Sequence, residues 1–283
     1  MTRWLVTGAG GMLGTDLTAL LRETGRPVTA AARADLDLAD AGAVAEAVRG
    51  HGVVVNCAAW TAVDAAETAE DAALAINGTA VEGLARACAE AGAALIQIST
   101  DYVLPGDDPS PAREDAPTGP VNAYGRTKLA GERAALAVGG RVVRTAWLYG
   151  AHGPNFVATM ARLAAERDTV DVVADQHGQP TWTADLAELL VRLGESAAPS
   201  GVYHGTNAGS TTWHGLASAV FEGLGLDPGR VRPTTSEAFP RPARRPAYSV
   251  LGHDAWTAAG LAPLRDWREA LAEHLAKDVI PTR

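Results

Sequence analysis

The sequence predicts an α/β protein with a Rossmann-like, doubly wound parallel sheet and a smaller C-terminal lobe. Short apolar runs alternate with helical stretches through the first half of the chain, which is typical of parallel strands joined by right-handed helical crossovers. A glycine-rich turn joins the first apolar run to the first helical stretch, as in nucleotide-binding folds. After Gly150 the alternation becomes irregular and proline returns often, which indicates a second lobe.

The expected elements follow one another in a simple order. Strands are predicted for the apolar runs 4–7, 27–32, 53–56, 94–99 and 141–145. Helices are predicted at 12–23, at 41–49 and, as one or two helices, at 69–91. The Pro-, Asp- and Gly-rich stretch 106–120 is typical of a surface loop. It precedes a helix that carries Tyr124 and Lys128.

These elements predict two units along the chain. Residues 1–150 would form a dinucleotide-binding domain, to which a segment near 169–195 returns. Within that segment, the run 170–173 is expected to rejoin the sheet. Residues 151–168 and 196–283 would form a smaller substrate-binding lobe.

Composition and charge exclude several classes of protein. The 283 residues are 47% hydrophobic and 20% charged, with a net charge of −9 and a pI near 5.3. An acidic protein does not attract nucleic acid or anionic membrane as a whole, and no apolar run approaches the roughly 20 residues of a membrane helix. We expect Cys57 and Cys88 to be buried thiols in a reducing cytoplasm. The protein is expected to be a monomer or a homodimer.

The glycine-rich turn predicts a dinucleotide site. Gly8, Gly11 and Gly14 follow a G-x-x-G-x-x-G pattern directly after the first strand. Such a turn lets the backbone approach a pyrophosphate while the following helix directs its N-terminus at the negative charge. Met12 and Leu13, in the same turn, are predicted to contact the cofactor.

The end of the second strand bears on which nicotinamide cofactor binds. NAD sites usually place an acid there, whereas an arginine accommodates the extra phosphate of NADP. The chain has Arg33 at this position, which favours NADPH, with NADH possible. Asp35 and Asp37 follow closely, and Asp37 with Leu38 is expected near the adenine.

Tyr124 and Lys128 stand out because the chain has only two lysines, Lys128 and Lys277. Residues four apart share a helix face, so the phenol and the ammonium are expected to converge. A nearby cation lowers the pKa of a phenol toward the range of an acid–base catalyst. The pair therefore predicts proton-transfer chemistry, with two residues on a solvated helix face as the alternative.

Taken together, these residues resemble the extended short-chain dehydrogenase/reductase superfamily, and within it the dTDP-4-dehydrorhamnose reductase family. The resemblance covers nearly the whole chain. It rests on the stretches Thr7–Gly14, Asn56–Asp64, Ser99–Val103, Tyr124–Glu132, Arg144–Trp147, Asp175–Thr181 and Arg245-Pro246 with Ser249. The chain departs from the usual pattern at Leu104-Pro105, where the family has Phe.

The resemblance implies hydride transfer from NADPH or NADH to the 4-keto carbon of a dTDP-6-deoxyhexos-4-ulose. Thr100 would position the ketone oxygen and Tyr124 would protonate the developing alkoxide. Lys128 would lower the pKa of Tyr124 and hydrogen-bond the nicotinamide ribose. Ala58 and Ala59 would let the cofactor approach the third strand.

Further residues are implied as substrate contacts. They are Thr61, Val63, Thr100, Asp101, Tyr102, Trp147, Asn155 and Arg245. Arg245 would clamp the sugar diphosphate, and Trp147 and Asn155 would hold the sugar and its nucleotide. Some members bind magnesium and Asp16 lies where one such carboxylate would, but we expect no required metal.

Two alternatives stay open. One is a nucleotide-sugar epimerase or dehydratase of the same superfamily; a dehydratase reads Thr-Asp-Glu where this chain has Thr100-Asp101-Tyr102. The other is a non-catalytic NADP-binding regulatory subunit, in which loss of the Tyr or the Lys is expected. The resemblance implies dTDP-4-dehydrorhamnose as substrate and dTDP-L-rhamnose as product, with a related deoxysugar as the alternative product.

Overall fold

Uninterrupted apolar runs form the strands of the main sheet in the computed structural model, which describes residues 1–279. Six strands pair in parallel in the order β10-β5-β4-β3-β1-β2. They are β1 (Trp4–Thr7), β2 (Val28–Ala31), β3 (Val53–Asn56), β4 (Ala94–Thr100), β5 (Arg141–Thr145) and β10 (Gly201–His204). β1 and β3 are buried along their whole length, as parallel strands covered on both faces are.

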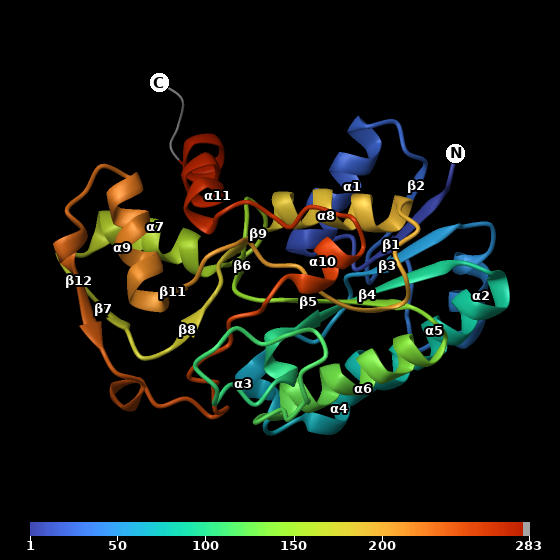
Figure 1. The fold of residues 1–283 in the computed structure, drawn as a ribbon, viewed down its shortest axis with the longest axis horizontal. Helices are drawn as coiled ribbons and strands as arrows, with labels where there is room; N and C mark the ends of the chain where they lie inside the picture. The colour runs from blue at the N-terminus through green and yellow to red at the C-terminus, as the bar shows by residue number, and fades with distance from the viewer. Residues whose placement is uncertain (280–283) are drawn as a thin grey trace.

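Helices cover both faces of this sheet, α1, α8 and α10 on one side and α2, α5 and α6 on the other (Figure 1). Successive strand residues point to opposite faces, so Trp4 and Val6 pack under α1 and α8 while Leu5 packs toward α2 and α5. The helices are α1 (Met12–Glu23), α2 (Ala41–Val48), α5 (Ala80–Ala91), α6 (Ala123–Ala137), α8 (Thr183–Glu195) and α10 (Asp254–Ala258).

The strand order reverses beside β1, because β2 follows it on one side and β3 on the other. Ligands of such sheets bind at this reversal, beyond the carboxyl ends of the strands. The register adds a step: Thr7 lies level with Asn56, and Asn56 with Gln97, so β4 extends three residues further to Thr100. The last residues of β4 therefore extend beyond the carboxyl ends of β1 and β3.

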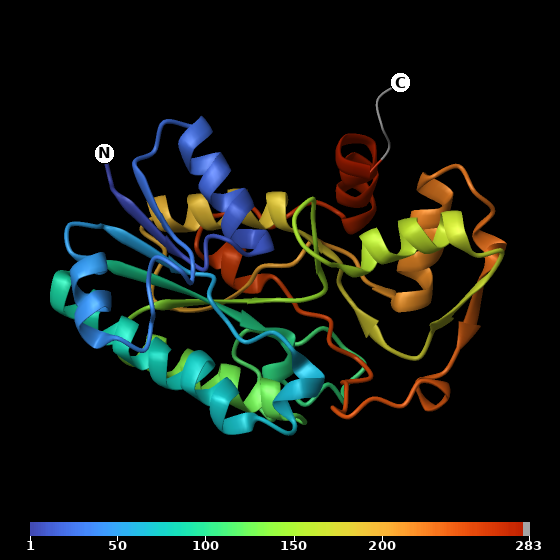
Figure 2. The same cartoon turned by 180° about the vertical axis from the view of Figure 1, so that it is seen from behind.

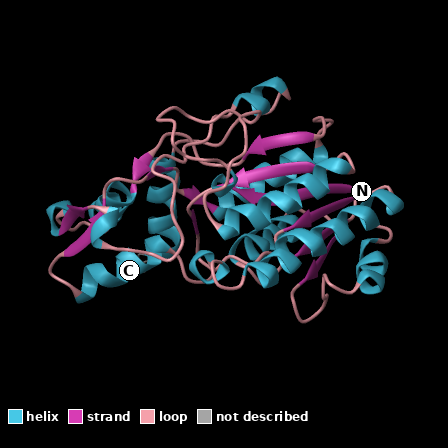
Figure 3. Ribbon diagram, turned by 90° about the horizontal axis from the view of Figure 1, so that it is seen from below, coloured by secondary structure: helices cyan, strands magenta, loops and turns pink. Residues whose placement is uncertain are grey.

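A smaller lobe with its own hydrophobic core lies beside the sheet (Figure 2). It contains α7 (Phe156–Glu166), α9 (Trp213–Gly223) and α11 (Trp267–His274). Its strand pairs are β6 (Leu148–Tyr149) with β9 (Thr181–Trp182), β7 (Val170–Val173) with β12 (Val231–Thr234), and β8 (His177–Gly178) with β11 (Thr211–Thr212). Long loops join the two lobes (Figure 3).

Short helical segments complete the structure. They are α3 (Val63–Ala66), α4 (Glu70–Leu74), a π-helical stretch Ala75–Thr79, 3-10 turns at Asp101–Val103, Pro228–Arg230 and Ser236–Ala238, and a second π-helical stretch Leu275–Val279. The predicted helical region 69–91 is thus α4, the π-helical stretch and α5 in succession.

One strand prediction is wrong. The run 170–173 does not rejoin the main sheet, because β7 pairs with β12 inside the smaller lobe. The segments that come back are α8, which packs on α1, and β10, which pairs with β5. A strand-like pattern does not specify its partner strand, and β10 occupies the sheet edge beside β5. The last four residues of the predicted lobe, 280–283, lie outside the described residues.

Candidate active site

The glycine-rich turn brings the backbone of β1, β3 and α1 into direct contact. Gly8 has a φ of +68°, and a Cβ there would lie 2.5 Å from the Ala58 nitrogen. A Cβ on Gly14 would lie 2.3 Å from the Gly8 oxygen. α1 begins after Gly11 with no side-chain cap, so its first N–H groups and its dipole are open to an anion. These features fit a dinucleotide pyrophosphate.

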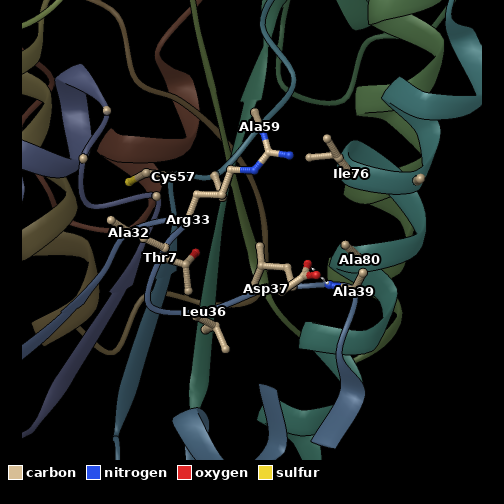
Figure 4. Close-up of a pocket in the computed structure, with 17 residues that line it drawn as sticks. Thr7, Ala32, Arg33, Leu36, Asp37, Ala39, Cys57, Ala59, Ile76 and Ala80 are labelled. Carbon is tan, nitrogen blue, oxygen red and sulfur yellow. Dashed lines mark hydrogen bonds between the residues drawn. The ribbon is translucent and has the colours of Figure 1, made fainter. Parts of the chain in front are cut away.

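A cavity of about 550 Å³ lies between the turn after β2 and the helical stretch that precedes α5. Its wall contains most of the predicted cofactor residues: Gly8, Gly11, Arg33, Asp37, Leu38, Ala58 and Ala59. Arg33 extends across the cavity toward Ile76 (Figure 4). Asp35 and Asp37 accept hydrogen bonds from the nearby backbone nitrogens of Ala32 and Ala39, both at 2.9 Å. The arginine is thus the side chain poised for a ligand phosphate.

A second cavity of about 650 Å³ adjoins the first and shares Gly10, Gly11, Cys57 and Ala59 with it. All three predicted catalytic residues line it. So do Met12, Leu13, Gly14, Thr61, Val63, Asp101, Tyr102 and Trp147. A dinucleotide that enters through the first cavity would extend its far end into the second, beside the catalytic residues.

The three predicted catalytic residues converge because α6 packs tightly on the end of β4. The Asn122 side chain caps α6 by accepting a hydrogen bond from Gly125 N at 2.8 Å. A Cβ on Gly125 would lie 2.1 Å from the Tyr102 carbonyl oxygen, so glycine permits this close approach. Tyr124 is thereby placed beside Thr100, and Lys128 follows one turn later with Nζ donating to the Ile98 carbonyl at 2.6 Å.

The electrostatics favour a protonated Tyr124. Burial raises the pKa of the phenol, the Asp101 charge raises it further, and the neighbouring Thr100 hydroxyl opposes both. Burial lowers the pKa of Lys128 to about 8, while the Glu132 charge opposes the shift. The spacing of Tyr124 and Lys128 predicted that the lysine would lower the phenol pKa. In the structure this pKa moves upward, because loss of hydration disfavours phenolate.

Glu132 lies on the same face of α6 as Lys128, one turn further on. It forms a bidentate ion pair with Arg144 on β5, with both N–O distances 2.9 Å and both side chains almost fully buried. The pair ties the catalytic helix to the central sheet, and its carboxylate favours the charged form of Lys128.

Two predicted substrate residues do not line the cavity. The Asn155 side chain caps α7, accepting from Ala158 N at 2.9 Å and donating to the Gly150 carbonyl at 2.9 Å. Arg245 forms a bidentate pair with Asp64 of α3, at 2.6 and 3.1 Å. The arginine predicted to clamp a diphosphate thus has a carboxylate partner in the structure.

Two residues that were not predicted from the sequence shape the site, one in the cavity wall and one behind it. Trp213, the first residue of α9, lines the second cavity from the smaller lobe. Asn77, in the π-helical stretch, accepts from Trp60 N at 2.9 Å and donates to Thr127 Oγ1 at 3.1 Å, which joins that stretch to the catalytic helix. Neither lies in a motif, so only the tertiary structure reveals them.

Among residues 1–279, no group of three or more His, Cys, Asp or Glu side chains is arranged to hold a metal ion. Asp16 lies 3.4 Å from the ring of His152. Within the same described part of the chain, no helix is long and apolar enough to cross a bilayer.

The fold and the site together define a nicotinamide-dependent short-chain dehydrogenase/reductase: a parallel sheet with a dinucleotide cradle and a Thr-Tyr-Lys trio at its carboxyl edge. Within that class, the chain belongs to the family described as RmlD substrate binding domain, whose model matches residues 2–280.

Similar proteins carry related names. The dTDP-4-dehydrorhamnose reductase of Streptomyces griseus is 61% identical, over 96% of this chain and 92% of its own. The dTDP-4-keto-6-deoxy-D-glucose reductase of Streptomyces niveus is 53% identical, over 96% of each chain. The crystal structure of the dTDP-4-dehydrorhamnose reductase from Bacillus anthracis in complex with NADP superposes with a TM-score of 0.94 at 36% identity, covering 98% of this chain and all of that one.

Proposed function

We propose that this protein reduces the 4-keto group of a dTDP-4-keto-6-deoxyhexose with NADPH, with dTDP-4-dehydrorhamnose as substrate and dTDP-L-rhamnose as product. The observation that carries the proposal is the meeting of two cavities, one suited to a dinucleotide and one lined by Thr100, Tyr124 and Lys128. The names of the similar proteins supply the substrate class, and the NADP complex of the Bacillus anthracis protein supports the cofactor.

The residues fit the cofactor at both ends. Gly8 and Gly14 leave space for its pyrophosphate, and Arg33 would pair with the 2′-phosphate of NADPH. When bound, NADPH supplies the hydride. Lys128 would hydrogen-bond the nicotinamide ribose, since an ammonium has two further donors beyond the one directed at Ile98.

Tyr124 acts as the proton donor. Reduction of a ketone places negative charge on its oxygen, and a phenol with a raised pKa is still protonated at neutral pH. Thr100 orients that oxygen from the end of β4, and its own hydroxyl donates to Asp101 Oδ1 at 2.8 Å. The Thr100 hydroxyl is thereby oriented at the end of β4, beside Tyr124 in the same cavity.

A dehydratase is less well supported. Elimination of water needs an additional acid beside the catalytic Thr, and Tyr102 occupies the position after Asp101. Its ring meets the Tyr124 ring edge-on at 6.0 Å, so this side of the cavity is aromatic. A non-catalytic regulatory role is disfavoured because Tyr124 and Lys128 are both present and both line the cavity.

Tyr124→Phe tests the catalytic proposal. We expect a 10²- to 10⁴-fold loss of kcat for ketone-dependent NADPH oxidation, the usual contribution of general acid catalysis, with NADPH affinity little changed. Wild-type protein is assayed with dTDP-4-dehydrorhamnose and with dTDP-4-keto-6-deoxyglucose, and NMR of the products identifies the sugar and its C4 configuration. Undiminished turnover by the variant would rule out Tyr124 as the acid.

The remaining assignments stay predictions: a cytoplasmic location and a monomer or homodimer. Light scattering of the purified protein measures the oligomeric state directly.

A further inference from the structure

We propose that Trp213 is a positioning residue: its indole holds Trp147 in one orientation, so that the smaller lobe fixes the wall of the sugar pocket. This inference rests on the proposed function. Both rings line the second cavity, Trp147 from the end of β5 and Trp213 from the start of α9. They stack with centroids 3.6 Å apart and planes only 9° from parallel.

Trp147 needs such a partner because its backbone is unusual. Its φ is +47°, and among residues 1–279 Trp147 is the only non-glycine residue with a positive φ. A bulky side chain in this region is strained, and strain of this kind persists only where the surroundings impose it. Contacts with neighbouring residues must therefore stabilise the strained conformation of Trp147.

Two features of the smaller lobe impose the orientation. A Cβ on Gly178 would lie 2.4 Å from the Trp147 ring, so the indole rests directly on the glycine backbone. Gly178 pairs with Thr211 between β8 and β11, and Trp213 follows two residues later. β8 thus provides Gly178, against which the Trp147 ring packs. The chain after β11 provides Trp213, which stacks on the same ring.

Trp213 is itself held by residues that do not line the second cavity. Its Nε1 donates to Gln176 Oε1 at 3.2 Å, and Gln176 Nε2 donates to Ser236 Oγ at 2.8 Å. The Phe156 ring packs against the Trp213 ring, with their centroids 4.7 Å apart. The Trp213 indole is therefore held in place by the smaller lobe, and it fixes Trp147, the ring that contacts the sugar.

The kinetic test compares Trp213→Leu, Trp213→Phe and Trp147→Leu. If Trp213 acts through Trp147, Trp213→Leu raises the KM for the sugar nucleotide at least tenfold, leaves the KM for NADPH within twofold, and reduces kcat less than it raises KM. Trp213→Phe, which retains a flat ring, recovers most of the affinity. In the Trp147→Leu background, Trp213→Leu then adds little.

Phe156→Leu is the matched control, because it also loosens packing around Trp213 but does not line the cavity. It should change the sugar KM less than threefold. A sugar KM that responds to Phe156→Leu as strongly as to Trp213→Leu would reduce Trp213 to a packing residue. Fully additive effects of the two Trp variants would overturn the positioning role, since Trp213 would then act independently of Trp147.

A readout without turnover keeps this test separate from the proposed function. Two stacked indoles give an exciton couplet in circular dichroism, which Trp213→Leu and Trp147→Leu should each abolish while NADPH binding persists. A couplet that is present in the wild-type protein and lost in both variants, together with a wild-type protein that reduces no dTDP-4-ketosugar, would mean that the proposed function fails and the stack stands. An unchanged couplet in both variants would overturn the stack itself.

Discussion

At the scale of single residues, Asp101 shows how position alters chemistry. The carboxyl follows Thr100 and is almost fully buried, so burial raises its pKa to about 6, against the hydrogen bond that Thr100 Oγ1 donates to Oδ1 at 2.8 Å. When ionised, it raises the pKa of Tyr124. The group therefore favours a protonated Tyr124 but is itself costly to bury with a charge.

Asp101→Asn should raise the free energy of unfolding of the protein while impairing its reductase activity. A folded-state pKa raised from 3.8 to about 6 means that the native state binds more protons between these values, so stability falls as pH rises through this window. At about 1.36 kcal/mol per pKa unit, the penalty above pH 6 is on the order of 3 kcal/mol. Urea unfolding should show the variant more stable at pH 8, with the advantage shrinking toward pH 5.

The same variant should shift the pH dependence of reduction. Without the negative charge the pKa of Tyr124 falls, so the alkaline limb of the kcat profile moves to lower pH. A stability difference that is constant between pH 5 and pH 8, or an unmoved alkaline limb, would contradict this account of Asp101.

Arg33 is the residue expected to distinguish NADPH from NADH. Its guanidinium lies in the wall of the first cavity while the neighbouring acids bind backbone nitrogens. Arg33→Ala should raise the KM for NADPH at least tenfold and leave the KM for NADH within about twofold, since only NADPH carries the 2′-phosphate. Arg49→Ala, at an exposed arginine remote from the cavity lining, is the control. Equal effects on both cofactors would assign Arg33 another role.

At the scale of elements, function depends on how closely α1 and α6 approach their neighbours. Each approach is made at a glycine: Gly14 against the turn after β1, and Gly125 against the turn after β4. The first opens the helix N-terminus to a pyrophosphate and the second sets Tyr124 beside Thr100. A methyl group at either position would separate surfaces that must touch.

Gly14→Ala tests the first of these contacts. The new Cβ would lie 2.3 Å from the Gly8 oxygen and 2.8 Å from the Ala9 Cα, so the turn must move. We expect a loss of roughly 1–3 kcal/mol in stability and at least a tenfold weaker Kd for NADPH in fluorescence titrations.

Gly83→Ala is the matched control for that variant. Gly83 lies within α5, and nothing lies within 4 Å of a Cβ there. The substitution should stabilise the protein by about 0.5–1 kcal/mol through helix propensity and leave NADPH binding unchanged. Similar losses in both variants would remove the argument for a specific contact at Gly14.

At the scale of the whole molecule, the segment 241–251 returns from the smaller lobe past the N-terminal end of α6 (Figures 1 and 2). The Arg244 carbonyl accepts from Asn122 at 2.8 Å, at the cap of α6, and Arg245 pairs with Asp64. Arg245 also lies near Tyr102, which lines the second cavity, and its positive charge opposes the rise that burial causes in the pKa of that phenol. This segment therefore ties the lobe to the rim of the sugar pocket.

Asp64→Asn should loosen that tie, because the amide cannot replace a bidentate carboxylate. We expect the KM for the sugar nucleotide to rise several-fold with the KM for NADPH unchanged, and limited proteolysis to cut segment 241–251 faster than in the wild-type protein. Asp71→Asn, on exposed α4, serves as control. A lower sugar KM would instead show that Asp64 competes with the substrate diphosphate for Arg245.

Local sequence patterns determined a large part of this molecule. Strands 4–7, 53–56 and 141–145 and the helix 12–23 were predicted with the bounds they have in the structure, because a buried parallel strand must be apolar throughout and a glycine turn marks where the helix begins. The lining of both cavities by most of the predicted residues has the same origin: short motifs at strand ends meet at one edge of the sheet.

Three matters were decided only by the tertiary structure. The partner of strand 170–173 depends on which sheet edge is free. The pKa of Tyr124 is raised by burial and by the Asp101 charge, although the spacing of Lys128 predicted a lowered pKa. The aromatic wall depends on a residue 66 positions away, since Trp147 is held by Trp213. Spacing along a chain specifies which side chains share an element, whereas burial, charge and packing partners arise from distant segments that no local pattern contains.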